Sequence, residues 1–179
     1  YYGRPFSADP RFASAFWTNG KRPAGFDDRQ RLTEVHCSGQ GGGNPESVFK
    51  LVGAKQVGLG SLAGMRVLAR LRCQNDVSIW PFQDADTDCV CVEIFPRHFL
   101  IRAGLGHRKV RNQADLDTAL AAYDSELVEL DGGDLDDNRT DALISAAALR
   151  RVAAADDVWR PPSMTPCARD HEGWIFGVM

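Results

Sequence analysis

The feature that most constrains the fold is an amphipathic helix that the sequence predicts from Asp136 onward. With 3.6 residues per turn, five residues fall on one stripe of this helix: Asp137, Asp141, Ile144, Ala148 and Val152. The stripe is acidic at its start and apolar after Asp141. If the apolar part packs on a sheet, two carboxylates point inward at the N-terminal end. Buried carboxylates need a cation, a proton or a set of hydrogen bonds.

Capping is the simpler role for the polar residues at this helix start. Asp136, Asp137 or Asn138 can accept a hydrogen bond from an amide of the first turn, as such residues commonly do. A cap explains only one of them and gives no role to Asp141, which lies a full turn inside the helix. Asp137 and Asp141 are therefore candidate site residues beside the capping interpretation.

The composition is that of an ordinary globular protein, with 44% hydrophobic and 25% charged residues. A length of 179 residues predicts a single α/β domain, 1–179, with a sizeable core. The net charge of −3 gives no overall basic field, so a nucleic acid or nucleotide partner would need a local patch. Five Cys residues without a Cys-x-x-Cys pair favour reduced thiols in the cytoplasm. Without an apolar run of about 18 residues, we expect no membrane partner.

Residues 1–44 are predicted to form an irregular N-terminal segment before a core at 45–179. Phe12 to Trp17 predicts one short helix within it. The densest basic stretch is either a solvated loop or an arm that contacts phosphate; its cations are Lys21, Arg22, Arg29 and Arg31. The chain starts at Tyr1 without a Met, and we expect further sequence upstream.

After the basic stretch, the sequence contains glycines and residues that are typical of helix starts. The stretch from Gly39 to Asn44 is either a mobile loop or an anion-binding loop, and it leads into a helix predicted from Pro45 to about Gly53. Another helix is predicted from Ser61 to Arg72, with Met65 in the core. Further predicted elements are a strand at 77–80, helices at 96–103 and 112–123, a basic turn at 104–109 and a final strand at 171–178.

The second informative stretch is Cys89–Phe95, which is apolar on both faces except for Glu93. A strand buried on both faces is typical of the centre of a sheet that helices cover. A lone carboxylate near the carboxyl end of such a strand lies where open α/β sheets place their sites. The alternative is that a neighbouring cation, such as Arg97, holds Glu93 as a structural ion pair.

Three segments together resemble an uncharacterised bacterial family of predicted nucleases with a ribonuclease H-like fold: Val92–Pro96, Asp137–Leu143 and Glu172–Ile175. The late helix is similar to the last catalytic helix of RuvC-type Holliday-junction resolvases, whose acids lie three apart just before Ala-Leu. The equivalent places here are Asn138 and Asp141. The resemblance covers about residues 45–178. It implies a mixed central sheet flanked by helices. Either the first strands of this sheet lie upstream of Tyr1, or the catalytic centre is incomplete.

The resemblance also implies a nuclease or phosphodiesterase that uses two Mg²⁺ or Mn²⁺ ions, since hard cations prefer carboxylate oxygens. In this scheme Glu93 bridges the metals, and Asp141 with either Asp137 or Asn138 completes the cluster. Arg97, His98 and Arg139 contact phosphate. Two departures stand against the pattern: no strand in residues 1–35 supplies the first-strand Asp of the fold, and Asn138 replaces an acid.

Two other functions fit the same sequence. One is a catalytically incomplete ribonuclease H-like module that binds a nucleotide or an acidic ligand through Arg97, Arg139 and the Gly39–Asn44 loop. The other is a fragment of the sugar-kinase and actin-like group. This group would be expected to carry a clear phosphate loop, and the sequence shows none. Metal-dependent cleavage would favour the nuclease, and ligand binding without metal would favour the module.

Overall fold

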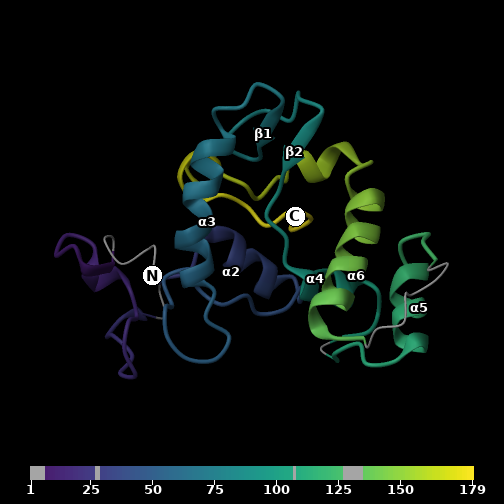
Figure 1. Ribbon diagram of the computed structural model, residues 1–179, viewed down its shortest axis with the longest axis horizontal. Helices are drawn as coiled ribbons and strands as arrows, with labels where there is room; N and C mark the ends of the chain where they lie inside the picture. The colour runs from purple at the N-terminus through teal and green to yellow at the C-terminus, as the bar shows by residue number, and fades with distance from the viewer. Residues whose placement is uncertain (1–6, 27–28, 107, 127–134) are drawn as a thin grey trace. The chain divides into compact units, whose positions relative to one another are not determined.

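The computed structural model describes residues 7–26, 29–106, 108–126 and 135–179, and most of the acidic stretch at 131–137 lies outside them. The described chain combines α-helices with a small parallel sheet (Figure 1), which confirms the α/β class. The helices are α2 (Leu32–Gly39), α3 (Gly58–Leu71), α4 (Pro96–Arg102), α5 (Gln113–Ala121) and α6 (Asp137–Val152). The strands are β1 (Val77–Ile79) and β2 (Cys89–Cys91), and the short helical turns are η1 (Ala13–Ala15), η3 (Asp156–Trp159) and the π-helix η4 (Ala168–Glu172).

The chain divides into two compact units, each built from three separate segments. Unit 1 comprises the described residues of Tyr1–Val35, Pro45–Val92 and Thr165–Trp174. Unit 2 comprises the described residues of His36–Asn44, Glu93–Met164 and Ile175–Met179. The single domain expected from the chain length stays a prediction. Within the described residues, no helix has the length and apolar character needed to cross a membrane.

In unit 1, β1 and β2 pair in parallel, with Val77 opposite Cys89, and α3 packs beside β1. The strand predicted at 77–80 is confirmed. The prediction that Cys89–Phe95 is a central strand buried on both faces is wrong, because Cys89 is exposed and Val90 is only half-buried. Met65 is 58% exposed, so its predicted place in the core is also wrong. The buried residues of α3 lie in its first turns, at Gly58 and Leu62.

No helix forms at residues 45–53, contrary to the prediction, because that backbone pairs with another segment. The Trp17 amide donates to the Phe49 carbonyl at 3.0 Å, and the Leu51 amide donates to the Trp17 carbonyl at 2.9 Å. Trp17 thereby takes up backbone groups that a helix through Phe49 and Leu51 would use. The helix predicted from Phe12 to Trp17 is reduced to the turn η1 for the same reason, since Trp17 is extended against this segment.

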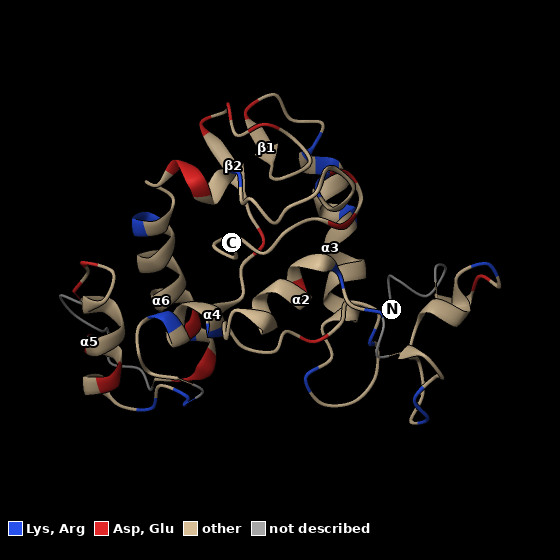
Figure 2. Cartoon of the chain, turned by 180° about the vertical axis from the view of Figure 1, so that it is seen from behind, with Lys and Arg blue, Asp and Glu red and all other residues tan. Residues whose placement is uncertain are grey.

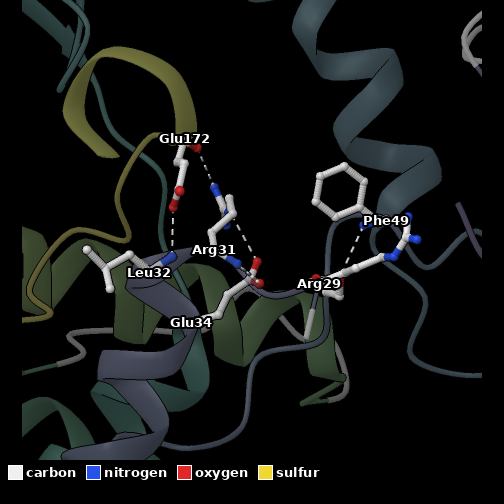
Figure 3. Close-up of polar contacts among 7 residues, drawn as sticks. Arg29, Arg31, Leu32, Glu34, Phe49 and Glu172 are labelled. Atoms are coloured by element: carbon white, nitrogen blue, oxygen red, sulfur yellow. Dashed lines mark hydrogen bonds and ion pairs between the residues drawn. The ribbon is translucent and has the colours of Figure 1, made fainter. Parts of the chain in front are cut away.

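The start of α2 is held by a network of charged side chains within unit 1 (Figure 3). The Glu172 carboxylate accepts a hydrogen bond from the Leu32 amide at 2.7 Å and so caps α2 from the C-terminal segment. Glu34 is 1% exposed and accepts from the Arg31 Nε at 2.9 Å and from the Arg31 amide at 3.0 Å. This buried carboxylate is therefore paired, as burial of a charge requires. The final strand predicted at 171–178 is wrong, because η4 continues to Glu172 and, of residues 173–179, only Ile175 forms a β-bridge.

Unit 2 is built on α6, which lies beside α4 and α5 (Figure 1). The predicted stripe is confirmed, since Ile144, Ala148 and Val152 are all buried. Pro96 begins α4 as predicted, and the Asn112 side chain caps α5 by accepting from the Asp115 amide at 2.9 Å. The core of the unit includes four other buried residues: Phe99, Leu116, Leu120 and Phe176.

Candidate functional site

The first turn of α6 fixes the position of the candidate carboxylates. The Asp136 side chain accepts a hydrogen bond from the Arg139 amide at 2.7 Å, so Asp136 is the cap. The Thr140 hydroxyl donates to the Asp136 carbonyl at 2.9 Å and closes the same turn. Because Asp136 makes the cap, neither Asp137 nor Asp141 is needed for it. These two residues lie one turn apart on one face of the helix.

Asp137 is held by two cations from the segment that precedes α5. Its carboxylate forms an ion pair with Lys109, and a second one with Arg111 at 2.6 Å. The hydrogen bond from Lys109, with the help of Arg111, lowers the pKa of Asp137 below its usual value. All three side chains are about half exposed, between 46% and 54%, so water and salt weaken these pairs.

Asp141 has the opposite electrostatic environment. Burial raises the pKa of this carboxyl group, and the negative charge of Asp137 raises it further. Arg97 and Lys109 oppose this shift without cancelling it. Helix α6 therefore carries two different carboxylates. Nearby cations stabilise the ionised form of Asp137, whereas burial and a like charge destabilise the ionised form of Asp141.

Both carboxylates line a half-enclosed pocket of about 170 Å³ within unit 2. Its lining comes from α4, from the segment after α4 and from α6: Arg97, Leu100, Lys109, Val110, Asp137, Thr140 and Asp141. Leu100 and Val110 are buried and supply the apolar part of the lining. Figure 2 shows the charged residues of this part of the chain. The pocket thus combines two cationic side chains, two carboxylates and an apolar surface.

The structure brings together three of the six site residues that the sequence predicts. Arg97, Asp137 and Asp141 line the pocket, and one Arg97 nitrogen donates to the Arg108 carbonyl at 2.9 Å. Glu93 does not line it: Glu93 is exposed, and its carbonyl accepts from the Phe176 amide at 2.8 Å. The bridge between Glu93 and Ile175 belongs to the backbone.

His98 and Arg139 also lie outside the pocket lining. His98 is 5% exposed, and its Nε2 lies 3.1 Å from the Gly177 carbonyl oxygen. Burial lowers the pKa of His98, so the ring is a poor phosphate ligand at neutral pH. The amide of Arg139 takes part in the cap, as described above.

The described residues do not fit a two-metal centre. Among them, no group of three or more His, Cys, Asp or Glu side chains lies where it could hold a metal ion. Asp137 and Asp141 share a pocket, but Asp137 already has two cationic partners. The role of Glu93, Asp137 and Asp141 as ligands of Mg²⁺ or Mn²⁺ stays a prediction.

Sequence reasoning missed Lys109, Thr140 and the two apolar residues of the lining. Lys109 ends the predicted basic turn, but no local pattern indicates that this turn returns to the start of α6. Thr140 lies between Asp137 and Asp141 and reads as an ordinary helix residue. These contacts depend on the packing of α4 against α6, which the sequence pattern does not specify.

A buried thiol and imidazole form a second pair in unit 2. The Cys37 Sγ lies 3.9 Å from the His98 Nδ1. Cys37 is fully buried, and burial raises its pKa to about 11. The thiol therefore stays protonated at neutral pH and is a weak nucleophile. This pair packs the core and is not a second candidate site.

The pocket around Asp141 is thus the candidate site that the geometry supports. Comparisons of the chain with protein-family models, with curated proteins and with solved structures find no match.

Proposed function

We propose that the pocket binds a small phosphorylated ligand and that the protein acts as a binding or regulatory module. The observation that carries this proposal is the convergence of Arg97 and Lys109 with Asp137 and Asp141 in one pocket. Guanidinium and ammonium groups bind phosphate oxygens through charge-assisted hydrogen bonds. Carboxylates accept hydrogen bonds from hydroxyl or amino groups. The lining therefore matches a ligand that carries both kinds of group.

A bare anion fits the pocket less well than such a ligand. Asp137 and Asp141 would repel an isolated phosphate, whereas a sugar phosphate or nucleotide offers hydroxyl donors beside its phosphate. The volume of about 170 Å³ is below the range of roughly 300–1,000 Å³ that is typical of sites for drug-sized ligands. The pocket therefore accommodates the phosphate and the adjacent sugar, and the rest of a larger ligand lies outside it.

Lys109 has a double role in this proposal. In the structure it pairs with Asp137, which Arg111 also contacts at 2.6 Å. When a phosphate enters, Lys109 can turn toward it while Arg111 keeps Asp137 paired. The ion pairs are half exposed, so the affinity falls as the ionic strength rises.

Isothermal titration calorimetry with ribose 5-phosphate, in the presence of a chelator, tests the proposal. We expect binding to the wild-type protein, no binding of ribose, and an affinity at least about tenfold lower for Arg97→Gln, because this variant cannot form the charge-assisted hydrogen bond. The matched control is Arg151→Gln, since Arg151 pairs with Asp124 at 2.8 Å outside the pocket lining. Equal affinities for the two variants, or no binding at all, would contradict the proposal.

A second candidate is the Mg²⁺- or Mn²⁺-dependent nuclease or phosphodiesterase, with a ribonuclease H-like fold and a cytoplasmic location. The observation in its favour is that Asp137 and Asp141 lie close enough for Asp137 to raise the pKa of Asp141. A divalent cation between them would relieve this repulsion. Cleavage of a labelled oligonucleotide in Mn²⁺ that Asp141→Asn abolishes would support this candidate. No cleavage by the wild-type protein would contradict the nuclease and favour the binding module.

A further inference from the structure

Trp17 lies at the centre of a cluster of aromatic and cationic side chains in unit 1. Its backbone pairs with residues 49–51 through two hydrogen bonds, from the Trp17 amide to Phe49 and from the Leu51 amide to Trp17. This pairing places Lys50 directly opposite Trp17. The Lys50 Nζ lies 5.4 Å from the centroid of the indole ring. The backbone pairing therefore brings this cation beside the ring.

A second cation reaches the same ring from the loop that follows it. The Arg22 Cζ lies 5.9 Å from the indole centroid. The loop is folded by Asn19, whose carbonyl accepts from the indole N–H and whose side chain accepts from the Lys21 amide at 3.1 Å. The Phe26 ring packs against the indole in a T-shaped arrangement, with the two ring centroids 5.3 Å apart.

A similar pair occurs five residues earlier in the same segment. The Arg11 Cζ lies 5.1 Å from the centroid of the Phe12 ring, and Phe12 is 46% exposed. Lys21 and Arg22 are exposed as well. The segment thus presents two aromatic rings with cations beside them, on a chain whose overall charge is −3. Figure 2 shows the basic residues of this segment.

We propose that this segment binds single-stranded nucleic acid through Arg11, Phe12, Trp17, Lys21 and Arg22, while Lys50, whose side chain is 13% exposed, supports the Trp17 ring. The exposed Phe12 ring and the half-buried Trp17 ring can stack on an unpaired base, and the exposed cations Lys21 and Arg22 can contact the backbone phosphates. Duplex DNA keeps its bases stacked and would use only the cations. An acidic peptide would also use the cations, but it gains nothing from the rings. The single strand is the partner that uses both parts of the surface.

Two carboxylates moderate the interaction. Asp9 pairs with Arg11 at 2.7 Å, and Glu46 pairs with Lys50 at 2.9 Å. A phosphate must compete with these carboxylates, which lowers the affinity, and salt weakens the phosphate contacts further. The proposal is independent of the pocket in unit 2, because no residue of the cluster belongs to the pocket lining.

Fluorescence anisotropy of a labelled oligothymidylate of about twenty nucleotides, with the full chain and at increasing salt, tests the proposal. We expect the logarithm of the affinity to fall linearly with the logarithm of the salt concentration. The exposed double variant Lys21→Gln/Arg22→Gln should bind several-fold more weakly, with a salt slope smaller by roughly 0.7 for each phosphate group that the variant no longer neutralises. Trp17→Leu should weaken binding several-fold, because it removes the stacking surface.

Arg72→Gln is the matched control, because Arg72 is exposed beyond the C-terminal end of α3. It should leave the affinity and the salt slope close to those of the wild-type protein. Circular dichroism checks the fold of Trp17→Leu, and the double variant carries the test if that fold is lost. The proposal is overturned if the wild-type protein does not bind, if Arg72→Gln weakens binding as much as the double variant, or if polyglutamate binds as tightly as the oligonucleotide.

Discussion

Asp141 carries an unfavourable charge at the start of α6. Burial and Asp137 raise its pKa, which means that the folded protein holds the proton of this group more readily than the unfolded chain does. The cost of ionising Asp141 is present in full above the raised pKa and is relieved as the pH falls through it. At still lower pH, below the unfolded pKa, both states are protonated and the difference disappears.

We therefore predict that Asp141→Asn raises the free energy of unfolding at about pH 7, by about 0.5 kcal/mol, the size of a like-charge pair one turn apart. The gain should shrink as the pH falls through the raised pKa of Asp141. Urea unfolding at several pH values measures it. Asp157→Asn is the control, because Asp157 is exposed and lies outside the pocket. A destabilised Asp141→Asn would instead make Asp141 a structural hydrogen-bond residue.

Gly42 leaves room for the buried His98. A Cβ at position 42 would lie 2.3 Å from the His98 Nδ1 and 3.1 Å from the Cys37 carbonyl oxygen. We predict that Gly42→Ala lowers the free energy of unfolding by about 1–3 kcal/mol through overpacking. The cost should be smaller in a His98→Ala background, where the ring is absent. Gly39→Ala should be nearly neutral, because that Cβ meets nothing within 4 Å. Equal effects at positions 39 and 42 would refute this account.

At the residue scale, the sequence could predict Asp137 and Asp141, because helical spacing places them on one face. Arg97 could be predicted as a neighbour of the site, since it follows the helix start at Pro96. Glu93 and His98 could not be judged correctly, because their burial depends on distant segments: Glu93 is exposed beside Phe176, and His98 is buried against Gly177.

At the scale of elements, α2 depends on a cap from a remote part of the chain. Glu172 accepts a hydrogen bond from the Leu32 amide at 2.7 Å and places a negative charge at the positive end of the helix dipole. The Arg31 guanidinium also donates to the Glu172 carbonyl at 3.3 Å. These contacts tie the C-terminal segment of unit 1 to the start of α2.

We predict that Glu172→Ala lowers the free energy of unfolding by about 1 kcal/mol, the usual cost of removing a cap. Glu172→Gln should cost less, because the amide oxygen still accepts the hydrogen bond. Chemical denaturation compares both variants with Glu126→Ala, a change at an exposed residue outside this network. A Glu172→Ala protein as stable as the control would show that the cap contributes nothing.

Local signals predicted the helices of unit 2 well. Pro96 at the start of α4, the Asn112 cap of α5 and the apolar stripe of α6 are all read from neighbouring residues. The helix expected at 45–53 failed although its cap and proline signals were present. Its backbone pairs instead with Trp17, a contact between segments about thirty residues apart that no local pattern records.

At the scale of the whole molecule, function depends on local groups of charge, because the net charge of −3 sets up no strong overall field. The pocket in unit 2 and the Trp17 surface in unit 1 each assemble residues that are distant in the sequence. Lys109 joins Asp137 from 28 positions away, and Lys50 joins Trp17 across a stretch that includes α2. The sequence pattern identified the basic turn at 104–109 and the basic stretch with Lys21 and Arg22. It could not place the turn beside Asp137 or the stretch beside Trp17.

A crystal structure with ribose 5-phosphate and Mn²⁺ tests the central claim most directly. The binding-module account predicts the phosphate within hydrogen-bond distance of Arg97 and Lys109, with Asp141 accepting from a sugar hydroxyl. The matched crystal of Arg97→Gln should hold the ligand at lower occupancy at the same ligand concentration. A pocket without phosphate in the wild-type crystal, with Mn²⁺ held by Asp141 and Glu93 instead, would contradict the account and establish the carboxylates as a metal centre.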